Sequence, residues 1–269
     1  MFAMTDSQSP VFDPDTLIKT AQQRCELREF RDALITPLSL VAGVVERRQT
    51  LPILANVQLS IESDLLTVTG TDLEVELQGR IPLNSSAEVV GEITVPGRKL
   101  LDICKALPEG SDLQFSLSED KLILKSGRSR FTLSTLPASD FPSVDHDSDG
   151  QGFSVLQADL KHMIDRTSFA MAQQDVRYYL NGMLWELTSE VLRLVATDGH
   201  RLAMCTLKSD AIGEVKASQV IVPRKGVLEM ARLLGGEAEE AQISIGSNHI
   251  RVATSDYTCL LYTSPSPRD

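Results

Sequence analysis

The sequence predicts an α+β protein made of two copies of one domain, with helices packed on one face of antiparallel sheets. Three observations lead to this class. Stretches with a helical period alternate with stretches that read as strands, turn residues separate the strands, and the whole series occurs twice in the same order. A chain of 269 residues has room for two domains of ordinary size.

The first copy contains two helices. In residues 30–45 the apolar residues recur at steps of three and four, which places them on one stripe: Leu34, Leu38, Val41 and Val45. In residues 97–107 the outer positions include Arg98 and Lys105, and the inward ones are Leu100, Leu101, Cys104 and Leu107. Each helix therefore has one apolar side for a sheet and one polar side for solvent.

Strands fill the stretches between and after these helices. In 56–83 apolar and polar residues alternate, which predicts Leu73, Val75 and Leu77 on one face and three acids on the other: Asp72, Glu74 and Glu76. This pattern is typical of a half-buried sheet with a solvated acidic face. Residues 112–136 read as further strands that turn at 118–120 and at 126–127.

The second copy repeats these features about 126 residues later. "VPGRKLLDICKAL" (95–107) is matched by "VPRKGVLEMARLL" (222–234), and "LLTVTGTDLEVEL" (65–77) is matched by "VLRLVATDGHRLAM" (191–204). We place the first domain at 25–145 and the second at 152–258, joined by a linker at 146–151.

The two ends of the chain fit neither copy. Residues 1–24 precede the first repeat and are expected to form a disordered extension. Residues 259–269, "CLLYTSPSPRD", lack core periodicity and are expected to form an anomalous tail. The N-terminus has no features of a signal peptide and no stretch is apolar enough to span a bilayer, so we expect a cytoplasmic location and no membrane contact.

The formal net charge of −11 is unevenly distributed. Residues 61–77 carry five acids and no basic residue, whereas 95–107 and 222–234 each carry three basic residues and one acid. We therefore expect acidic sheets and a basic helix face on the same molecule.

The motifs of common enzymes are missing from the sequence, including the phosphate-binding, dinucleotide-binding, zinc-protease and serine-hydrolase patterns. The four cysteines lie far apart and predict neither a disulfide framework nor a zinc site. The best metal candidate is the acidic series Asp72, Glu74 and Glu76, although a solvated strand face explains it more simply. In "TDGHR" (197–201), Asp198 and His200 could serve acid–base chemistry, but a polar turn between strands is the simpler reading. We expect no cofactor.

Contact with a polyanion is the chemistry that remains. Basic residues recur at equivalent places in the two copies: Arg98, Lys105, Arg224, Lys225 and Arg232, with Arg48 after the first helix. "QDVRYYLNG" (174–182) adds Gln174, Arg177 and two adjacent tyrosines, which in a strand or its entrance would point to opposite sides. These groups can hydrogen-bond phosphate, and no base-reading helix is evident, so the sequence predicts backbone contact with duplex DNA without sequence choice.

Several of these stretches together resemble the bacterial DNA polymerase III beta subunits, the sliding-clamp family: "RQTLPILANV", "VPGRKLLDICKALPEG", "SGRSRFTLSTLPASDFP", "QDVRYYLNGML" and "VATDGHRLAM". The resemblance covers residues 25 to 258. It implies a DNA-clamp fold with three similar domains per chain, and two chains that close head to tail into a homodimeric ring lined by helices. It also implies a non-catalytic processivity factor that encircles duplex DNA and tethers DNA polymerase III, with its alpha subunit and clamp-loader subunits as peptide-motif partners.

The same resemblance implies two sets of site residues. The DNA-contacting set is Arg48, Arg98, Gln174, Tyr178 and Tyr179, with Lys225 as an addition. The second-domain wall of a partner-peptide pocket is Leu180, Thr197, Gly199, His200, Arg201 and Leu202.

The resemblance ends after Thr258, where the family continues into a third repeat. The sequence therefore looks like a C-terminally truncated clamp, and we expect it not to close the family's ring. Two other hypotheses stay open: a metal-dependent nuclease that uses Asp72, Glu74 and Glu76, and a protein-interaction module that does not bind DNA.

Overall fold

The protein is represented by a computed structural model that describes residues 27–45, 51–83, 91–118, 120–142, 151–208, 215–236, 238–246 and 248–263. The predicted extension at 1–24, Arg48, most of the predicted linker and the last residues of the predicted tail lie outside these ranges.

In its described residues the first domain has two α-helices and eight strands. In chain order these are β1 (Leu27–Phe30), α2 (Arg31–Val44), the short 3-10 helix η1 (Pro52–Ala55), β2 (Asn56–Glu62), β3 (Leu65–Thr71), β4 (Val75–Pro82), β5 (Gly91–Pro96), α3 (Gly97–Ala106), β6 (Asp112–Ser118), β7 (Lys121–Ser126), β8 (Ser129–Ser134) and η2 (Ala138–Asp140).

The second domain repeats this series. Its elements are β9 (Gln151–Leu156), α4 (Gln157–Thr167), η3 (Ser168–Ala170), η4 (Tyr178–Leu180), β10 (Gly182–Leu187), β11 (Val191–Thr197), β12 (Leu202–Lys208), β13 (Ser218–Pro223), α5 (Arg224–Leu233), β14 (Glu240–Ile245), β15 (His249–Ala253) and β16 (Tyr257–Tyr262).

The strand orders show that the two domains have one topology. β5-β2-β3-β4 in the first domain corresponds to β13-β10-β11-β12 in the second, and β1-β6-β7-β8 corresponds to β9-β14-β15-β16. All of these neighbours are antiparallel. The α+β class predicted from the sequence is therefore confirmed.

A single eight-stranded sheet joins the two domains. Its order is β5-β2-β3-β4-β16-β15-β14-β9, because β4 of the first domain pairs antiparallel with β16 of the second. We call this junction the seam. Cys259 lies opposite Leu77 and Leu260 lies opposite Glu76 in its ladder.

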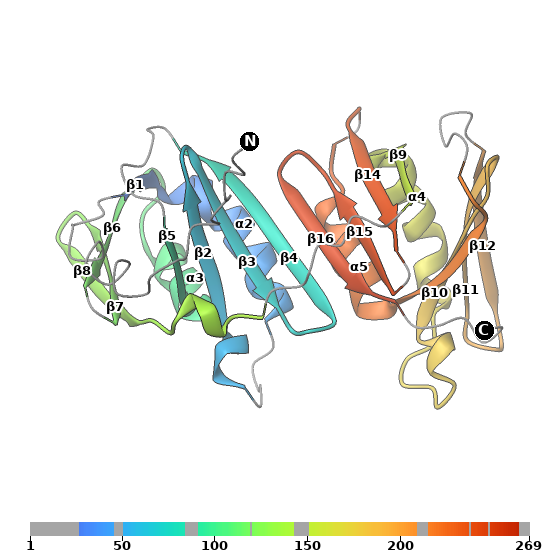
Figure 1. Ribbon diagram of the computed structural model, residues 1–269, viewed down its shortest axis with the longest axis horizontal. Helices are drawn as coiled ribbons and strands as arrows, with labels where there is room; N and C mark the ends of the chain where they lie inside the picture. Colours follow the sequence, from blue (N-terminus) through green and yellow to red (C-terminus); the bar gives the residue numbers. More distant parts are fainter. Residues whose placement is uncertain are drawn as a thin grey trace, which may run out of the picture.

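The α-helices of the described residues form one continuous row. α3 packs against α2, α2 packs against α5, and α5 packs against α4. Figure 1 shows α2, α3 and α5 behind the strands of the eight-stranded sheet, so that the sheet covers one side of the row along both domains. The helices of the two repeats therefore lie on the same face of the eight-stranded sheet.

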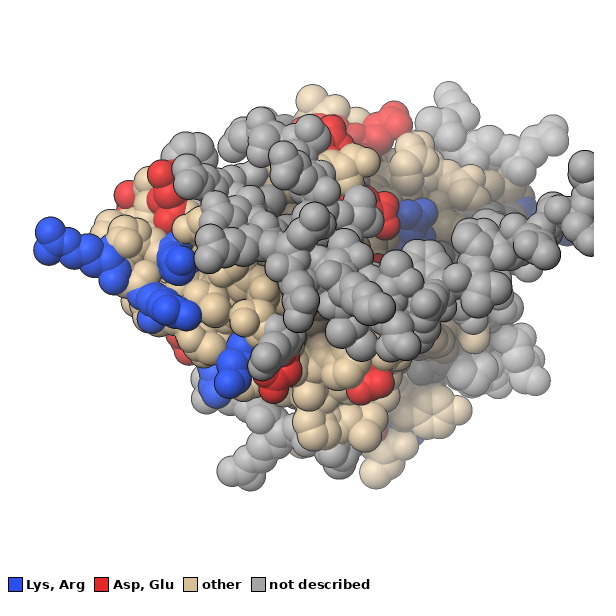
Figure 2. All heavy atoms as spheres, turned by 60° about the vertical axis from the view of Figure 1, so that its left-hand side comes forward, with Lys and Arg blue, Asp and Glu red and all other residues tan. Residues whose placement is uncertain are grey.

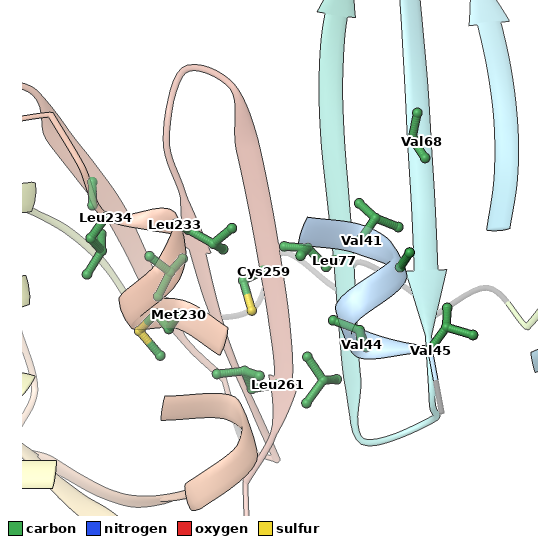
Figure 3. Packing of buried hydrophobic residues seen from close by; sticks show 14 of the residues in the cluster. Val41, Val44, Val45, Val68, Leu77, Met230, Leu233, Leu234, Cys259 and Leu261 are labelled. Carbon is green, nitrogen blue, oxygen red and sulfur yellow. The ribbon is translucent and has the colours of Figure 1, made fainter. Parts of the chain in front are cut away.

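The hydrophobic core runs through the seam without a break. The predicted stripes on α2 and α3 are buried, which confirms their inward assignment. Figure 3 shows Leu77 of the first domain beside Cys259 of the second, with Val44 and Val45 on the first-domain side and Leu261 on the other, and all belong to one buried cluster. Burial in an apolar interior raises the pKa of the Cys259 thiol, as it does for Cys104, whose pKa rises to about 11. Cys104 is therefore buried, as its predicted inward position requires.

The predicted end of the second domain at residue 258 lies inside β16. Residues 259–262 continue this strand, and Cys259, Leu260 and Leu261 are buried, so they belong to the sheet and not to a tail. Their run of apolar residues lacks an alternating pattern because the strand is covered on both faces, as parallel core strands also are. Among the described residues, no helix combines the length and the apolar character that a membrane crossing requires.

Candidate nucleic-acid interface

Arg98 and Arg224 occupy the first turns of α3 and α5, which are equivalent places in the two repeats. Arg98 Nη2 donates to the Val45 carbonyl at 2.8 Å, just past the end of α2, and Arg224 Nη1 donates to the Met171 carbonyl at 3.4 Å. Each arginine thus returns one N–H to a carbonyl that follows the preceding helix. A guanidinium has five donors, so each can still offer N–H groups to a phosphate.

Lys225 follows Arg224 but is directed across the seam. Its ammonium group forms an ion pair with Asp72 of the first domain, whose side chain is only 5% exposed. Asp72 also accepts the backbone N–H groups of Glu74 and Val75, which fixes the turn that enters β4. The structure therefore gives Lys225 a contact between domains, and its contact with DNA stays a prediction.

The loop before β10 carries the predicted Gln174, Tyr178 and Tyr179. All three side chains are exposed, and Gln174 has a left-handed backbone with φ of 57°. The tyrosines lie in the 3-10 turn η4 with their ring centroids 5.9 Å apart, edge to face. They lie at the entrance of β10, one of the two places expected for them. The expectation that they point to opposite sides is wrong, because a 3-10 turn keeps consecutive side chains on neighbouring sides of one surface.

An ion pair shapes the same loop. Both oxygens of Asp175 accept from the Arg177 guanidinium, at 3.0 and 2.9 Å, and Oδ1 also accepts the Arg177 backbone N–H at 2.8 Å. The hydrogen bonds from Arg177 lower the pKa of Asp175 to about 2. The main chain of the loop is held by Asn181, whose amide bonds both the N–H and the carbonyl of Asp175.

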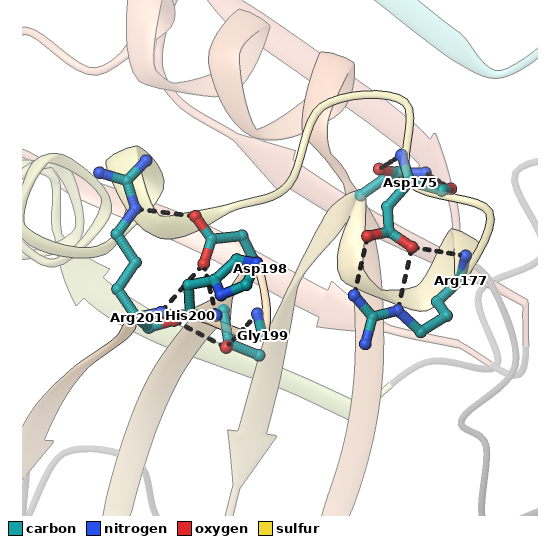
Figure 4. Close-up of polar contacts among 8 residues, drawn as sticks. Asp175, Arg177, Asp198, Gly199, His200 and Arg201 are labelled. Carbon is teal, nitrogen blue, oxygen red and sulfur yellow. Dashed lines mark hydrogen bonds and ion pairs between the residues drawn. The ribbon is translucent and has the colours of Figure 1, made fainter.

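The "TDGHR" segment is a turn between β11 and β12, as the simpler reading predicted. Asp198 accepts the backbone N–H groups of His200 and Arg201, which lowers its pKa, and Gly199 takes a φ of 87°. A side chain at residue 199 would meet the Arg177 guanidinium, so this turn and the Asp175 loop lie side by side (Figure 4). The geometry gives Asp198 and His200 structural contacts and shows no acid–base pair between them.

The structure adds an apolar residue that sequence reasoning missed. Phe169 is 57% exposed at η3, which packs beside β12, and the Arg201 guanidinium lies over its ring at 5.6 Å from the centroid. Leu202 and Met204 are also exposed and share one face of β12. We call Phe169, Leu202 and Met204 the apolar patch. Leu180, by contrast, is buried and offers little surface to a partner.

The acidic series does not form the predicted strand face. Asp72 lies in the turn before β4, Glu74 is exposed, and Glu76 is buried at 4% exposure with the Gln78 amide donating to it. Leu73, which was expected inside, is exposed with a positive φ. Glu76 is buried because β16 pairs with β4 here, which no periodicity within the first repeat could indicate. Leu73 is exposed because Asp72 closes a local turn, as Asp198 does in the second repeat. No group of three or more potential metal ligands occurs in the part of the chain that the structure describes.

Charge is segregated on the first domain. Arg98, Lys99 and Lys105 are exposed on α3 against one exposed acid, Asp102. In Figure 2 the Lys and Arg side chains of this end of the molecule gather at one edge of the view, while Asp and Glu side chains are spread over it. On α5 the excess of basic over acidic side chains is smaller in effect, because Arg232 forms an ion pair with Glu229 at 2.7 Å.

Comparison with family models decides the assignment. Residues 26–145 match the N-terminal domain of the DNA polymerase III beta subunit, and residues 154–261 match its central domain. The chain belongs to the DNA polymerase III beta subunit family. The resemblance noted from the motifs is confirmed.

Relatives and solved structures agree with this family. The chain is 60% identical to the beta sliding clamp of Pseudomonas aeruginosa over 228 residues, which is 85% of this chain and 62% of that protein. It is 48% identical to the beta sliding clamp of Escherichia coli K12 over 84% of this chain and 61% of that protein. The chain thus spans about three fifths of the length of these relatives.

The fold is that of solved beta subunits. The crystal structure of the DNA polymerase III subunit beta from Pseudomonas aeruginosa matches with a TM-score of 0.85 at 56% identity, covering 90% of this chain and 65% of that one. The sliding clamp from Caulobacter crescentus matches with a TM-score of 0.82 at 37% identity, covering 90% and 66%. The predicted DNA-clamp fold is confirmed.

Proposed function

We propose that this chain acts as part of a DNA sliding clamp, which holds duplex DNA without sequence choice and tethers a replicative polymerase without catalysing a reaction. The observation that carries this proposal is the continuous row α3-α2-α5-α4 on one side of a sheet that crosses both domains. Such a wall offers a duplex one long surface. The relatives of this chain from Pseudomonas aeruginosa and Escherichia coli are named beta sliding clamps.

The DNA contacts in this proposal are weak and diffuse. Arg98, Gln174, Tyr178 and Tyr179 offer N–H and O–H groups to phosphate oxygens, and Arg48 and Lys225 are proposed to add charge. Phosphate contacts position a protein on a duplex but carry no sequence information. A clamp needs only contacts of this kind, because a closed ring is retained by its shape while it moves. Ring closure by a head-to-tail homodimer belongs to the same proposal for the whole protein.

The salt dependence of DNA binding tests the contact surface. Binding of a fluorescent duplex should weaken linearly in log–log plots against salt, and Arg98→Gln should reduce the slope by about 0.9, the value of one phosphate contact. Arg251→Gln is the matched control, because this substitution removes the same charge from a site outside the proposed surface. Arg251 is exposed on β15, and its neighbours Ile250 and Val252 face the core. Equal slopes for both variants, or no binding at low salt, would contradict the proposed surface.

A second surface is proposed for partner peptides. The apolar patch and the "TDGHR" turn, with Thr197, Gly199, His200 and Arg201, form a wall with aromatic, aliphatic and cationic groups, which suits an apolar peptide with an acidic flank. We propose the DNA polymerase III alpha subunit and clamp-loader subunits as the sources of such peptides.

The peptide proposal is tested by titrating a short peptide from the C-terminal end of a polymerase alpha subunit. Leu202→Ser and Phe169→Ser should each weaken binding at least several-fold, while Leu51→Ser, which alters an exposed leucine of the first domain, should not. Unchanged affinity in both patch variants would show that the peptide binds elsewhere.

A further inference from the structure

We propose that Arg177 is shared between two sites, so that a DNA duplex and an acidic peptide compete for its guanidinium group. One site is the Asp175 loop (residues 172–181), which carries three of the proposed DNA contacts. The other is the peptide wall, formed by the apolar patch and the "TDGHR" turn. This inference rests on the proposed function and adds regulation to it, because each ligand is then expected to weaken the binding of the other.

Arg177 belongs to the Asp175 loop but lies against the neighbouring turn. Its Nε and Nη2 donate to the two carboxylate oxygens of Asp175 at 3.0 and 2.9 Å, which fixes the plane of the guanidinium group. A side-chain carbon added at Gly199 would lie 3.2 Å from Nη2 and 3.4 Å from Nη1. Figure 4 shows the guanidinium group pointing from its loop toward this turn. The arginine is therefore a contact between the two sites.

One nitrogen of this guanidinium group is left for a ligand. Asp175 accepts from Nε and Nη2, whereas Nη1 donates to no acceptor in the part of the chain that the structure describes. The Arg177 side chain is 49% exposed, so a ligand can reach it from solvent. A planar guanidinium group with free N–H donors suits both phosphate and carboxylate oxygens. The ion pair with Asp175 thus holds a cationic donor in place and leaves part of it unused.

Residues of both sites act electrostatically on this ion pair. The hydrogen bond and the charge of Asp175 raise the pKa of Arg177, and the Tyr179 hydroxyl adds a smaller contribution of the same sign. The hydrogen bonds from Arg177 lower the pKa of Asp175, and the charge of His200 adds a smaller contribution. Tyr179 is one of the proposed DNA contacts, and His200 belongs to the peptide wall. The ion pair therefore lies within electrostatic range of both sites.

Backbone hydrogen bonds hold the Asp175 loop to the proposed DNA surface. The Asn181 carbonyl accepts the N–H of Arg224, in the first turn of α5, at 2.9 Å. Leu180 N donates to the Arg177 carbonyl at 2.8 Å, which closes the turn that carries the two tyrosines. In the sequence Arg177 directly precedes Tyr178. A phosphate bound by this loop therefore lies beside the residue that carries the free donor.

Hydrogen bonds and a ring contact likewise join the turn to the apolar patch. Asp198 accepts the backbone N–H groups of His200 and Arg201, and it also accepts from Arg201 Nε at 2.9 Å. The Arg201 guanidinium lies over the ring of Phe169, at 5.6 Å from its centroid. A peptide whose apolar part rests on the patch places its acidic flank over the turn, where Arg177 and Arg201 supply positive charge.

One donor group cannot serve two anions at full strength. A phosphate on the loop and a carboxylate on the turn compete for Nη1, and each brings negative charge close to the other. Binding linkage makes this effect reciprocal, because the duplex lowers the peptide affinity by the same factor as the peptide lowers the duplex affinity. We expect a factor of about five at low salt, the lower end for coupled sites, since the pair is exposed. The factor should fall as salt is raised.

Amide NMR spectra of the full chain test the link within the protein. Titration with a short duplex should shift the resonances of Gly199 and His200 together with that of Tyr178, with one midpoint. In Arg177→Gln the Tyr178 resonance should still shift, whereas the two resonances of the turn should stay in place. Shifts in the turn that persist unchanged in this variant would overturn Arg177 as the link.

A binding cycle measures the coupling itself. The affinity of the polymerase peptide is measured with and without saturating duplex, and we expect it to be about five-fold lower with duplex. Arg177→Gln should weaken each ligand and bring the ratio of the two affinities close to one. Arg193→Gln is the matched control, because it removes the same charge from β11, the strand that leads into the turn, and it should keep the ratio of the parent.

The outcomes separate this inference from the proposed function. If either ligand fails to bind the parent chain, the proposed function fails and this inference fails with it. If both ligands bind and the ratio is one in the parent, or is the same in Arg177→Gln as in the parent, only the shared arginine is overturned.

Discussion

β4 and β12 are equivalent strands in the two repeats, yet their surroundings are opposite. Glu76 of β4 is 4% exposed, while its equivalent on β12, Leu202, is 65% exposed. The difference is that β16 lies beside β4, whereas β12 ends its sheet. The neighbouring strand, and not the polarity of the residue, therefore decides which of these two side chains is buried. Substitutions in β4 and β12 should accordingly change the free energy of unfolding by different amounts.

The largest effect should come from truncating a side chain inside the seam. Leu261 is fully buried and packs against Gly226 of α5, so Leu261→Ala should lower the free energy of unfolding by about 2–5 kcal/mol. Leu202→Ala, the same change on the open edge, should stay within about 0.5 kcal/mol. Chemical denaturation followed by the fluorescence of Trp185, the one tryptophan of the sequence, measures both. Similar losses in the two variants would show that the neighbouring strand does not set the energetic difference between β4 and β12.

The Arg80 contacts should give the next largest effect. Arg80→Met keeps much of the side-chain volume but removes the hydrogen bonds to the turn before β16, and we expect a loss of about 1–3 kcal/mol. Thr206→Met alters the equivalent site on the open edge and should be close to neutral. The same denaturation experiment applies, and hydrogen exchange should show faster exchange in β16 for Arg80→Met only.

The aspartates that precede β4 and β12 also differ in their contacts. Asp72 and Asp198 both accept backbone N–H groups of the following turn, but only Asp72 pairs with a lysine from the other repeat. Asp72→Asn keeps the turn and weakens the ion pair, so we expect a loss of about 1–2 kcal/mol. Asp198→Asn should cost less.

A cycle with Lys225 separates its two proposed roles. If Lys225 serves the seam, Lys225→Gln should couple to Asp72→Asn in unfolding experiments. The salt slope of DNA binding should then change less than in Arg98→Gln. If Lys225→Gln lowers the salt slope of DNA binding as much as Arg98→Gln does and does not couple to Asp72→Asn, Lys225 contacts DNA instead.

The smallest expected effect on stability concerns the Asp175 loop beside β12. At the seam a lysine of the other domain pairs with Asp72, whereas here the partner of the aspartate is the nearby Arg177. The pKa of Asp175 is held at about 2, below its ordinary value of 3.8, by hydrogen bonds from Arg177. Its contribution to stability is therefore complete above about pH 4 and is lost as the pH falls toward 2. In Arg177→Gln the pKa should rise toward 3.8, which a carboxyl NMR titration measures; an unchanged pKa would remove Arg177 as its cause.

Most of the fold could be predicted because each repeat carries its own periodicity. The stripe from Leu34 to Val45 and the turn at Asp198 follow from local spacing, and both are present in the structure. What could not be predicted is contact between the repeats. The burial of Glu76 and the strand at 259–262 both depend on the pairing of β4 with β16, which leaves no periodic trace in either strand.

In the candidate sites, too, the features set by local sequence could be predicted, and those set by contacts between distant segments could not. The exposure of Arg98, Gln174, Tyr178 and Tyr179 agrees with a contact role, but the attachment of Lys225 to Asp72 depends on which helix end meets which turn. Phe169 was missed because it follows the last residue of α4, where helical spacing no longer applies, and the turn η3 places it outward beside Arg201.

The unbroken eight-stranded sheet has a mechanical consequence. A force that tries to spread the two domains apart along the row of strands acts on the ladder between β4 and β16, which has the same backbone bonds as the ladders inside each domain. The boundary between the domains is then as stiff as their interiors. Elastic strain applied to the molecule would be shared along its whole length, and the angle between the two domains would be kept under load.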